Sequence, residues 1–313
     1  MEGSGTSAAT RLRWNVLGAV LFLALCLGCF FVFFFDVEMS SSISQSIRLF
    51  GSAADPTPPA LRGSPRHVEL SVLVGVLTLP DRYDGRHRLR LVYRTQPTTL
   101  AEIDLKFVLC NLTTESQRVM VGLEILLYND IIILNCTENM NDGKTYTYFS
   151  SLPSILPRRY DYVLKADDDT FFRLAPLAAS LWPLPREELY YGFVIPCEKK
   201  EPLGGWYMSG MGYVLSWDLV EFIAKANITG QEKVGAEDQM LGWWLNKAHR
   251  GKNRYNMKPH MYDHPAVGGK CSHEFWPGTV AVHRLKTQDR WIDTLQYFNA
   301  TRAIKPSILY HLD

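Results

Sequence analysis

The chain has 313 residues, with 33 basic and 32 acidic side chains and a net charge of +1 at pH 7. Proteins that bind nucleic acid through its phosphates usually carry a clear basic excess, so this balance argues against a general nucleic-acid binder. Beyond the N-terminal segment about 250 residues remain, which is enough for one large α/β domain or two small ones.

The N-terminal segment contains an apolar run, residues 16–35, without a single charged side chain. At about 1.5 Å per residue, a helix of this length spans about 30 Å, the hydrocarbon thickness of a bilayer. Two arginines precede the run and two acidic residues follow it, so the positive-inside tendency predicts a cytoplasmic tail over residues 1–15 and a lumenal remainder. A cleaved signal peptide usually has a shorter apolar region, of about 7–15 residues, so we interpret residues 16–35 as a signal-anchor.

Potential glycosylation sites and cysteines agree with a lumenal location. Four N-x-[ST] sequons occur, at Asn111, Asn135, Asn227 and Asn299. Outside the apolar run the cysteines are Cys110, Cys136, Cys197 and Cys271. In an oxidising compartment these four can form up to two disulfides, and the sequence leaves all three connectivities open.

Residues 36–66 are expected to form a lumenal stem, because they are rich in Ser, Pro, Gly and Ala and show no sustained periodicity. We expect one catalytic domain over residues 67–313. Apolar runs predict its strands at 68–79, 106–110, 131–134, 162–164, 190–195 and 279–283. Helices are predicted at 86–95, 116–128, 144–152 (ending at Pro153), 217–226 and 236–246, with loop structure over 250–278. This alternation predicts an α/β fold with a mostly parallel central sheet and ligands at the carboxyl ends of its strands.

One strand ends in three consecutive carboxylates, Asp167, Asp168 and Asp169. Adjacent carboxylates repel one another unless a cation or hydrogen-bond donors lie among them. A hard divalent cation, which often also binds substrate phosphates, is the natural partner. A solvated acidic turn is the simpler interpretation, but the apolar residues on both sides of the cluster favour the metal.

Other polar residues are less informative on their own. Glu237 and Asp238 begin a predicted helix, where acidic side chains favour the helix dipole without any further role. His283 ends the last predicted strand, and a lone histidine is more often structural than a ligand. Arg86 and Arg90 lie one helical turn apart and are typical of a solvated basic face.

Considered together and in order, these segments resemble a family of Golgi β-1,3-glycosyltransferases that includes β-1,3-galactosyltransferases, β-1,3-N-acetylglucosaminyltransferases and fringe. The resemblance runs from about residue 68 to about residue 285 and rests on the ordered blocks RLRLVY, KFVL, YNDII, KT, YVLKADDD, SGMGYVLS, EDQMLG and VHRLK. It implies a GT-A fold that binds a nucleotide sugar with a divalent metal and inverts the anomeric carbon.

The resemblance also implies roles for individual residues. Asp169 and His283 would bind Mn²⁺ or Mg²⁺, and Asp167 and Asp168 would help to hold the metal, its water shell and the ribose. The metal would bridge the diphosphate of a UDP-sugar and stabilise the charge on the departing UDP. Asp238 would be the general base that takes the proton of the acceptor's 3-hydroxyl, and Glu237 would orient the acceptor.

The remaining implied residues are substrate contacts. Trp206, Tyr207, Ser209, Gly210 and Gly212 would line the sugar site, whereas Arg86, Arg90 and Lys165 would lie near the nucleotide. The chain departs from the family pattern in three places: Gly204-Gly205-Trp206 replaces Tyr-Pro-Pro, Met208 replaces a common Cys, and Tyr93 stands where Trp is usual. These departures leave the disulfide pattern and the acceptor pocket open.

We therefore expect a single-pass type II Golgi membrane protein that transfers a hexose, with galactose favoured, to a glycan on a glycoprotein or glycolipid. UDP-N-acetylglucosamine as donor, or an inactive glycan-binding protein of the same fold, are the alternatives. A haloacid-dehalogenase-type phosphotransferase is excluded, because Phe171 occupies the position that requires Thr or Val.

Overall fold

The computed structural model describes residues 70–198, 206–226, 228–305 and 307–309. The chain divides into two units, residues 1–66 and 67–313, and the description concerns the second. The predicted tail, anchor and stem, together with Asn227, lie outside the described residues. Within the described ranges, the helices are all too short or too polar to cross a bilayer. The predicted domain boundaries therefore stay predictions.

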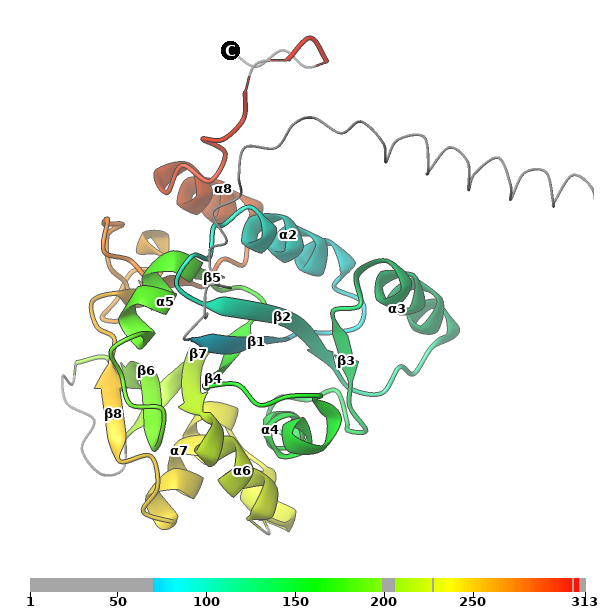
Figure 1. Cartoon of the computed structure of the whole chain (residues 1–313), viewed down its shortest axis with the longest axis vertical. Helices are drawn as coiled ribbons and strands as arrows, with labels where there is room; N and C mark the ends of the chain where they lie inside the picture. Colours follow the sequence, from blue (N-terminus) through cyan, green and yellow to red (C-terminus); the bar gives the residue numbers. More distant parts are fainter. Residues whose placement is uncertain (1–69, 199–205, 227, 306, 310–313) are drawn as a thin grey trace, which may run out of the picture. The chain divides into compact units, whose positions relative to one another are not determined.

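A seven-stranded mixed sheet forms the centre of this unit, in the order β3-β2-β1-β4-β7-β6-β8 (Figure 1). Its strands are β1 (Ser71–Leu77), β2 (Glu102–Leu109), β3 (Ile131–Ile133), β4 (Tyr162–Asp167), β6 (Leu189–Ile195), β7 (Tyr207–Ser216) and β8 (Asn253–Asn256). Neighbouring strands are parallel except where β7 pairs with β4 and β6. The predicted α/β class with a mostly parallel sheet is therefore confirmed.

Helices cover both faces of the sheet, and the alternation of side chains along β1 shows why. Val72, Val74 and Val76 point to one core, which α2 (Tyr83–Arg94), α5 (Leu174–Leu181) and α8 (Gln288–Tyr297) complete. Leu73 and Leu77 point to the other core, formed with α4 (Lys144–Ile155), α6 (Trp217–Lys225) and α7 (Glu237–Lys247). Side chains alternate between faces along a strand, so each face of a central strand needs its own apolar cover. Helix α3 (Glu115–Tyr128) lies beside β3 at the end of the sheet (Figure 1).

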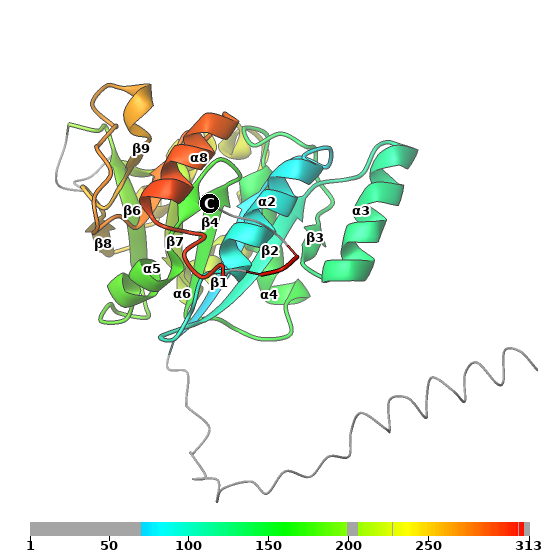
Figure 2. The same ribbon diagram turned by 90° about the horizontal axis from the view of Figure 1, so that it is seen from above.

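A second, three-stranded sheet joins segments that are far apart in the sequence. It consists of β5 (Phe171–Phe172), β9 (Met261–Asp263) and β10 (Ala281–His283) in the order β5-β10-β9. Strand β5 follows the acidic cluster by one residue, and β10 ends at His283. Antiparallel pairing of Phe171 with Val282 therefore brings the C-terminal part of the chain to the carboxyl end of β4. Figure 2 shows α8, which follows β10, lying next to α2 above the main sheet.

Two predictions about secondary structure were wrong. Helix α4 does not end at Pro153 but continues to Ile155. In the last helical turn a proline removes only one hydrogen bond, and burial of Phe149 and Leu152 against the sheet stabilises the helix. The predicted loop over 250–278 contains β8 and β9. Strand β8 has four mostly polar residues and β9 has only three residues, so neither shows a recognisable alternation.

The disulfide connectivity that the sequence left open is Cys110–Cys136 and Cys197–Cys271. The first bridge joins the segments that follow β2 and β3, two adjacent parallel strands. The second joins the segment after β6 to the loop after β9. Each bridge therefore joins two segments that follow the carboxyl ends of strands.

Candidate active site at the carboxyl end of β4

The acidic cluster and His283 meet where the two sheets join. Asp167 is the last residue of β4, and Asp169 lies two residues before β5. The Nε2 atom of His283 lies 3.3 Å from Oδ1 of Asp169 and 3.8 Å from Oδ2 of Asp167. Each of these three residues offers one ligand atom, and the three atoms lie within 4.8 Å of one another. Two carboxylates and an imidazole at this spacing can hold a divalent ion such as Mn²⁺.

Protonation of His283 compensates for the negative charge of this cluster. Burial lowers the pKa of the imidazole, but hydrogen bonds with Asp169 and Asp263 outweigh burial and raise it to about 9. Burial likewise raises the pKa of the Asp169 carboxyl, while the His283 contact lowers it, and the net pKa is below the ordinary value. The ion-free cluster is therefore stabilised by a cation at neutral pH, namely the imidazolium.

Lys165 is fully buried and lies on β4, two residues before Asp167. Its ammonium donates to Oδ1 of Asp167 at 2.7 Å, to the carbonyl of Gly210 at 2.7 Å and to Oε1 of Glu237 at 2.6 Å. Burial lowers the pKa of Lys165, but the two carboxylates outweigh burial and raise it above its ordinary value. All three donors of the ammonium are thus used within the protein, and the nucleotide contact of Lys165 stays a prediction.

Glu237 and Asp238, adjacent at the start of α7, differ in how much acceptor capacity they retain. Glu237 is buried and accepts from Lys165, from the Tyr213 hydroxyl at 2.7 Å and from the Thr145 hydroxyl at 3.3 Å. Asp238 is half-buried, and each of its oxygens accepts one backbone N–H, from Gly210 and from Gln239, at 2.8 Å. A carboxylate oxygen has two lone pairs, so Asp238 can still accept a proton from a substrate.

The predicted sugar-contacting residues belong to β7 and to the residue just before it. Trp206, Tyr207, Ser209 and Gly210 are half-buried, whereas Gly212 is buried. The Gly210 N–H donates to Asp238. Glycine is required at two of these positions. A Cβ on Gly210 would lie 2.6 Å from Oε1 of Glu237, and one on Gly212 would lie 2.4 Å from the Phe172 ring. The absence of these side chains allows β7 to approach the buried carboxylate and β5.

Beside the acidic cluster lies a cavity of about 390 Å³. Asp167, Asp168 and Asp169 form one wall. Asp168 accepts from the Thr78 hydroxyl at 2.6 Å and from Arg82 at 3.0 Å. Burial raises the pKa of Asp168, and the Thr78 hydrogen bond and Arg82 oppose that rise.

Four basic residues also line the cavity: Arg82, Arg88, Lys144 and Lys286. Of these, only Lys144, in the KT block, had drawn attention in the sequence, as a structural or phosphate-binding residue. Trp291 contributes an apolar wall beneath Arg88, whose guanidinium lies 5.5 Å from the indole centroid. Burial lowers the pKa of Lys144, which donates to the Thr78 carbonyl and pairs with Glu138. The sequence does not show that these residues meet, because Arg82 and Arg88 lie just before and within α2, Lys144 begins α4, and Lys286 lies between β10 and α8.

The two arginines that the resemblance places near the nucleotide are held in buried ion pairs with acidic residues outside α2. Arg86 is fully buried and donates to Glu124 and to the carbonyls of Leu79 and Pro80. Arg90 forms a two-point contact with Asp130 at 2.8 and 2.9 Å and also pairs with Glu124. Neither arginine lines the cavity that contains the acidic cluster. In the described structure, Arg86 and Arg90 join α2 to α3 and β3.

Three sequon asparagines lie in the described structure, at Asn111, Asn135 and Asn299, and all are exposed. The side-chain amide of Asn111 donates to Asn135 at 3.1 Å, next to the Cys110–Cys136 disulfide. Their occupancy stays a prediction.

Comparison with known sequences finds similarity to galactosyltransferases. Residues 86–203 match the family model described as Galactosyltransferase. Beta-1,3-galactosyltransferase 6 of Mus musculus is 31% identical over 149 residues, which cover 41% of this chain and 45% of that protein. Probable beta-1,3-galactosyltransferase 12 of Arabidopsis thaliana is 26% identical over 238 residues, which cover 64% of this chain and 63% of that protein. The chain thus spans less than two thirds of the length of either relative.

Among solved structures, a galactosyltransferase in complex with donor and acceptor sugar analogues aligns with 76% of this chain and 98% of its own. The alignment has a TM-score of 0.44 and 14% sequence identity.

Replacing Gly210 by alanine tests the packing around Lys165. The new methyl group would lie against Glu237, Asp238 and Lys165, so we expect the free energy of unfolding to fall by about 1–3 kcal/mol. Urea unfolding measures the loss. Gly122→Ala is the matched control. Gly122 lies within α3 with open space around it, and alanine there should raise stability by about 0.5–1 kcal/mol. Equal stability changes for the two variants would contradict the packing described.

The raised pKa of His283 predicts how the stability of the metal-free protein depends on pH. A histidine whose pKa is higher in the folded state contributes stability below its unfolded value of about 6.5, and that contribution disappears as the pH rises through the folded pKa, about 9. In the presence of a chelator, the urea concentration at the midpoint of unfolding should therefore decrease as the pH is raised from about 7 to about 9.5. His283→Gln should give a flatter profile, and parallel profiles would refute this account.

Proposed function

We propose that this chain, which carries a galactosyltransferase-family domain, is an inverting GT-A glycosyltransferase that transfers galactose from UDP-galactose to an acceptor glycan in β-1,3 linkage. One observation carries the proposal. Lys165 joins Asp167, in the cluster with metal-ligand spacing, to Glu237, which precedes the half-buried Asp238. The buried ammonium of Lys165 thus lies between the acidic cluster, where the leaving group would bind, and Asp238, which would act as the base.

The donor set fits a hard or borderline divalent ion. Asp167, Asp169 and His283 would hold Mn²⁺ or Mg²⁺, with a proton leaving His283 on binding, since only neutral imidazole is a ligand. When bound, such an ion stabilises the negative charge of a departing diphosphate. Arg82, Arg88, Lys144 and Lys286 line the adjacent cavity and would balance the remaining charge of that group.

The protein's own part in the transfer concerns Asp238. The acceptor hydroxyl would lie against the free lone pairs of Asp238, and its proton would pass to that carboxylate as the oxygen forms its bond to the anomeric carbon. The bond from that carbon to the UDP oxygen breaks on the opposite face, so the configuration inverts. The Gly210 N–H holds the Asp238 carboxylate in place, and Glu237 fixes the start of α7 through Lys165 and Tyr213.

Galactose is proposed because both relatives described above are named as β-1,3-galactosyltransferases. The catalytic chemistry is the same for UDP-N-acetylglucosamine, so the activity test includes both donors.

We further propose that residues 16–35 anchor the chain in the Golgi membrane with the catalytic domain in the lumen. The two disulfides fit an oxidising compartment.

Donor hydrolysis and transfer test the enzyme and its base. The purified protein should release UDP from UDP-galactose in the presence of Mn²⁺ and a suitable acceptor, and more slowly from UDP-N-acetylglucosamine. Asp238→Asn should lower kcat by about 10²- to 10⁴-fold and leave UDP binding unchanged, because only proton transfer is removed. Asp169→Ala should abolish the activity that Mn²⁺ supports. Asp289→Asn, an exposed carboxylate at the start of α8, is the control and should retain activity.

Full activity in Asp238→Asn would reject Asp238 as the base. Preference for UDP-N-acetylglucosamine would correct the donor but preserve the reaction class. Failure of the folded protein to bind either UDP-sugar would overturn the proposed function.

Orientation in the membrane can be tested through the exposed sequons. When the full chain is expressed in a secretory host, peptide-N-glycosidase should increase its electrophoretic mobility, because Asn111, Asn135 and Asn299 are predicted to face the lumen. Replacement of the three asparagines by glutamine, together with Asn227→Gln, should abolish the shift. A chain without any glycan that fractionates with cytosolic proteins would contradict the proposed orientation.

A further inference from the structure

Asp263 makes the shortest contact of the His283 side chain and was not identified in the sequence. Its Oδ1 atom lies 2.7 Å from Nδ1 of His283, on the side of the ring opposite the Asp167 and Asp169 contacts. Asp263 and His283 are direct cross-strand partners of the parallel pair β9–β10. Residues in register on adjacent strands point to the same face, so the backbone pairing itself brings the carboxylate to the imidazole.

The contact determines which nitrogen of His283 faces the acidic cluster. A carboxylate that accepts from Nδ1–H leaves Nε2 as the nitrogen for a metal and fixes the plane of the ring. Asp263 is buried, and its other oxygen lies 3.7 Å from the half-exposed Arg284. Its strongest partner is therefore the imidazole.

The backbone on both sides of this pair is also held. Asp263 donates its N–H to the Cys271 carbonyl at 2.9 Å, and its own carbonyl accepts from His273 at 3.4 Å. Arg284, directly after His283, has a left-handed φ of 65°, which costs a non-glycine residue about 1 kcal/mol or more. This turn allows the next residue, Leu285, to donate its N–H to the Asp169 carbonyl at 3.0 Å. The strained turn thus connects the histidine strand to the acidic cluster.

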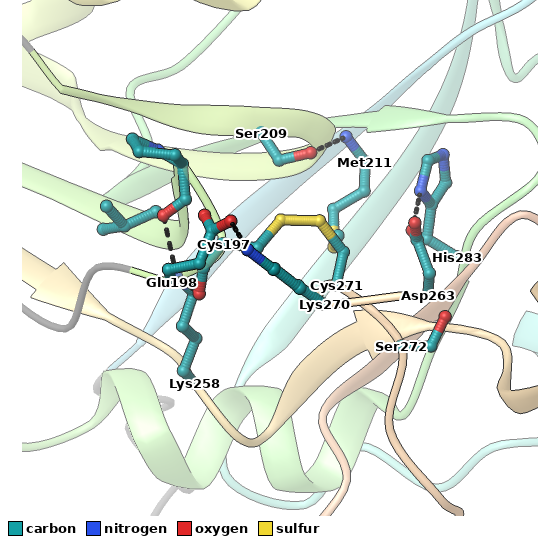
Figure 3. Close-up of a disulfide and its surroundings, with 12 residues drawn as sticks. Cys197, Glu198, Ser209, Met211, Lys258, Asp263, Lys270, Cys271, Ser272 and His283 are labelled. Carbon is teal, nitrogen blue, oxygen red and sulfur yellow. Dashed lines mark hydrogen bonds and ion pairs between the residues drawn. A yellow bond between two sulfur atoms is a disulfide. The ribbon is translucent and has the colours of Figure 1, made fainter. Parts of the chain in front are cut away.

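The Cys197–Cys271 disulfide lies next to Asp263 and ties the segment that contacts Asp263 to the end of β6 (Figure 3). Cys271 carries the carbonyl that binds Asp263, and Cys197 follows β6 of the main sheet. Lys258 donates to the Cys197 carbonyl at 2.6 Å, and Lys270 pairs with Glu198 at 2.6 Å beside the bridge. Figure 3 shows the disulfide and the Asp263–His283 contact side by side, with Ser272 next to them.

We propose that Asp263 is the positioning residue of the metal site, and that the Cys197–Cys271 disulfide holds Asp263 in place. The inference rests on the proposed function, since it concerns the metal of that site. It makes the disulfide a determinant of metal affinity as well as of stability. Reduction of this bridge should therefore weaken the metal site before the fold is lost.

The test measures Mn²⁺ affinity of the purified full chain by calorimetry, without any sugar nucleotide. Asp263→Ala should weaken Mn²⁺ binding by about 10- to 100-fold, the usual effect of losing a carboxylate that orients a histidine ligand. Asp263→Asn should restore most of the affinity, because its carbonyl oxygen can still accept from Nδ1–H. Asp161→Ala is the control. Asp161 accepts from Ser71 at the opposite end of β4, so its loss should lower stability and leave Mn²⁺ affinity unchanged.

The disulfide is tested by the double variant Cys197→Ser and Cys271→Ser, with Cys110→Ser and Cys136→Ser as the matched control. Both double variants lose one cross-link, and urea unfolding shows how much stability each has lost. Only the first should also lose Mn²⁺ affinity. Equal Mn²⁺ affinity in the wild type and in folded Asp263→Ala would overturn the role of Asp263. Equal affinity in the two disulfide variants would overturn the role of the bridge.

A wild-type protein that binds no Mn²⁺ would remove the metal from the proposed function and this inference with it. If the wild type binds Mn²⁺ and the Asp263 and cysteine variants match it, the proposed function stands and only this inference fails.

Discussion

The ammonium of Lys165 is the interaction on which the rest of the site depends. A charge taken fully out of water is tolerated only when it is paired and its hydrogen-bonding capacity is used. Lys165 satisfies this condition through three acceptors on three elements: Asp167 on β4, the Gly210 carbonyl on β7 and Glu237 on α7. Any displacement of one element would leave the buried charge partly unpaired. The spacing between the candidate metal ligands and Asp238 is therefore fixed by the fold.

Adjacent carboxylates in this site have different environments, and the difference separates structural from chemical roles. Glu237 accepts from Lys165, Tyr213 and Thr145, so it stabilises the arrangement. Asp238, one residue later, accepts hydrogen bonds from two backbone N–H groups in the described structure and retains acceptor capacity. At the C-terminal side of the site, Asp263 orients His283 in the same way that Glu237 fixes the start of α7. Each proposed functional residue thus has a buried neighbour that holds its element in place: Glu237 beside Asp238, and Asp263 beside His283.

Sequence reasoning identified the elements with strong periodicity and the residues in recognisable blocks. The long apolar strands β1 and β6 and helices α3, α6 and α7 were predicted nearly to their ends. Strands β8 and β9 were missed because such short strands are stabilised by pairing, which leaves no local pattern. Asp263 was missed for the same reason, since its importance comes from its register with His283, which lies 20 positions later in the chain. A single sequence contains no signal for such a pairing.

Helix α2 shows why spacing alone could not assign its basic residues. Arg86 and Arg90, one turn apart, share a face, and the sequence indicates that much. It does not indicate that this face meets Glu124 and Asp130, which bury both guanidinium groups. Arg88, half a turn away, reaches the cavity instead. Because the buried pair fixes the rotation of α2 about its axis, it determines that Arg88 is presented to the cavity. The conspicuous arginine pair thus contributes to the proposed nucleotide site by orienting the helix.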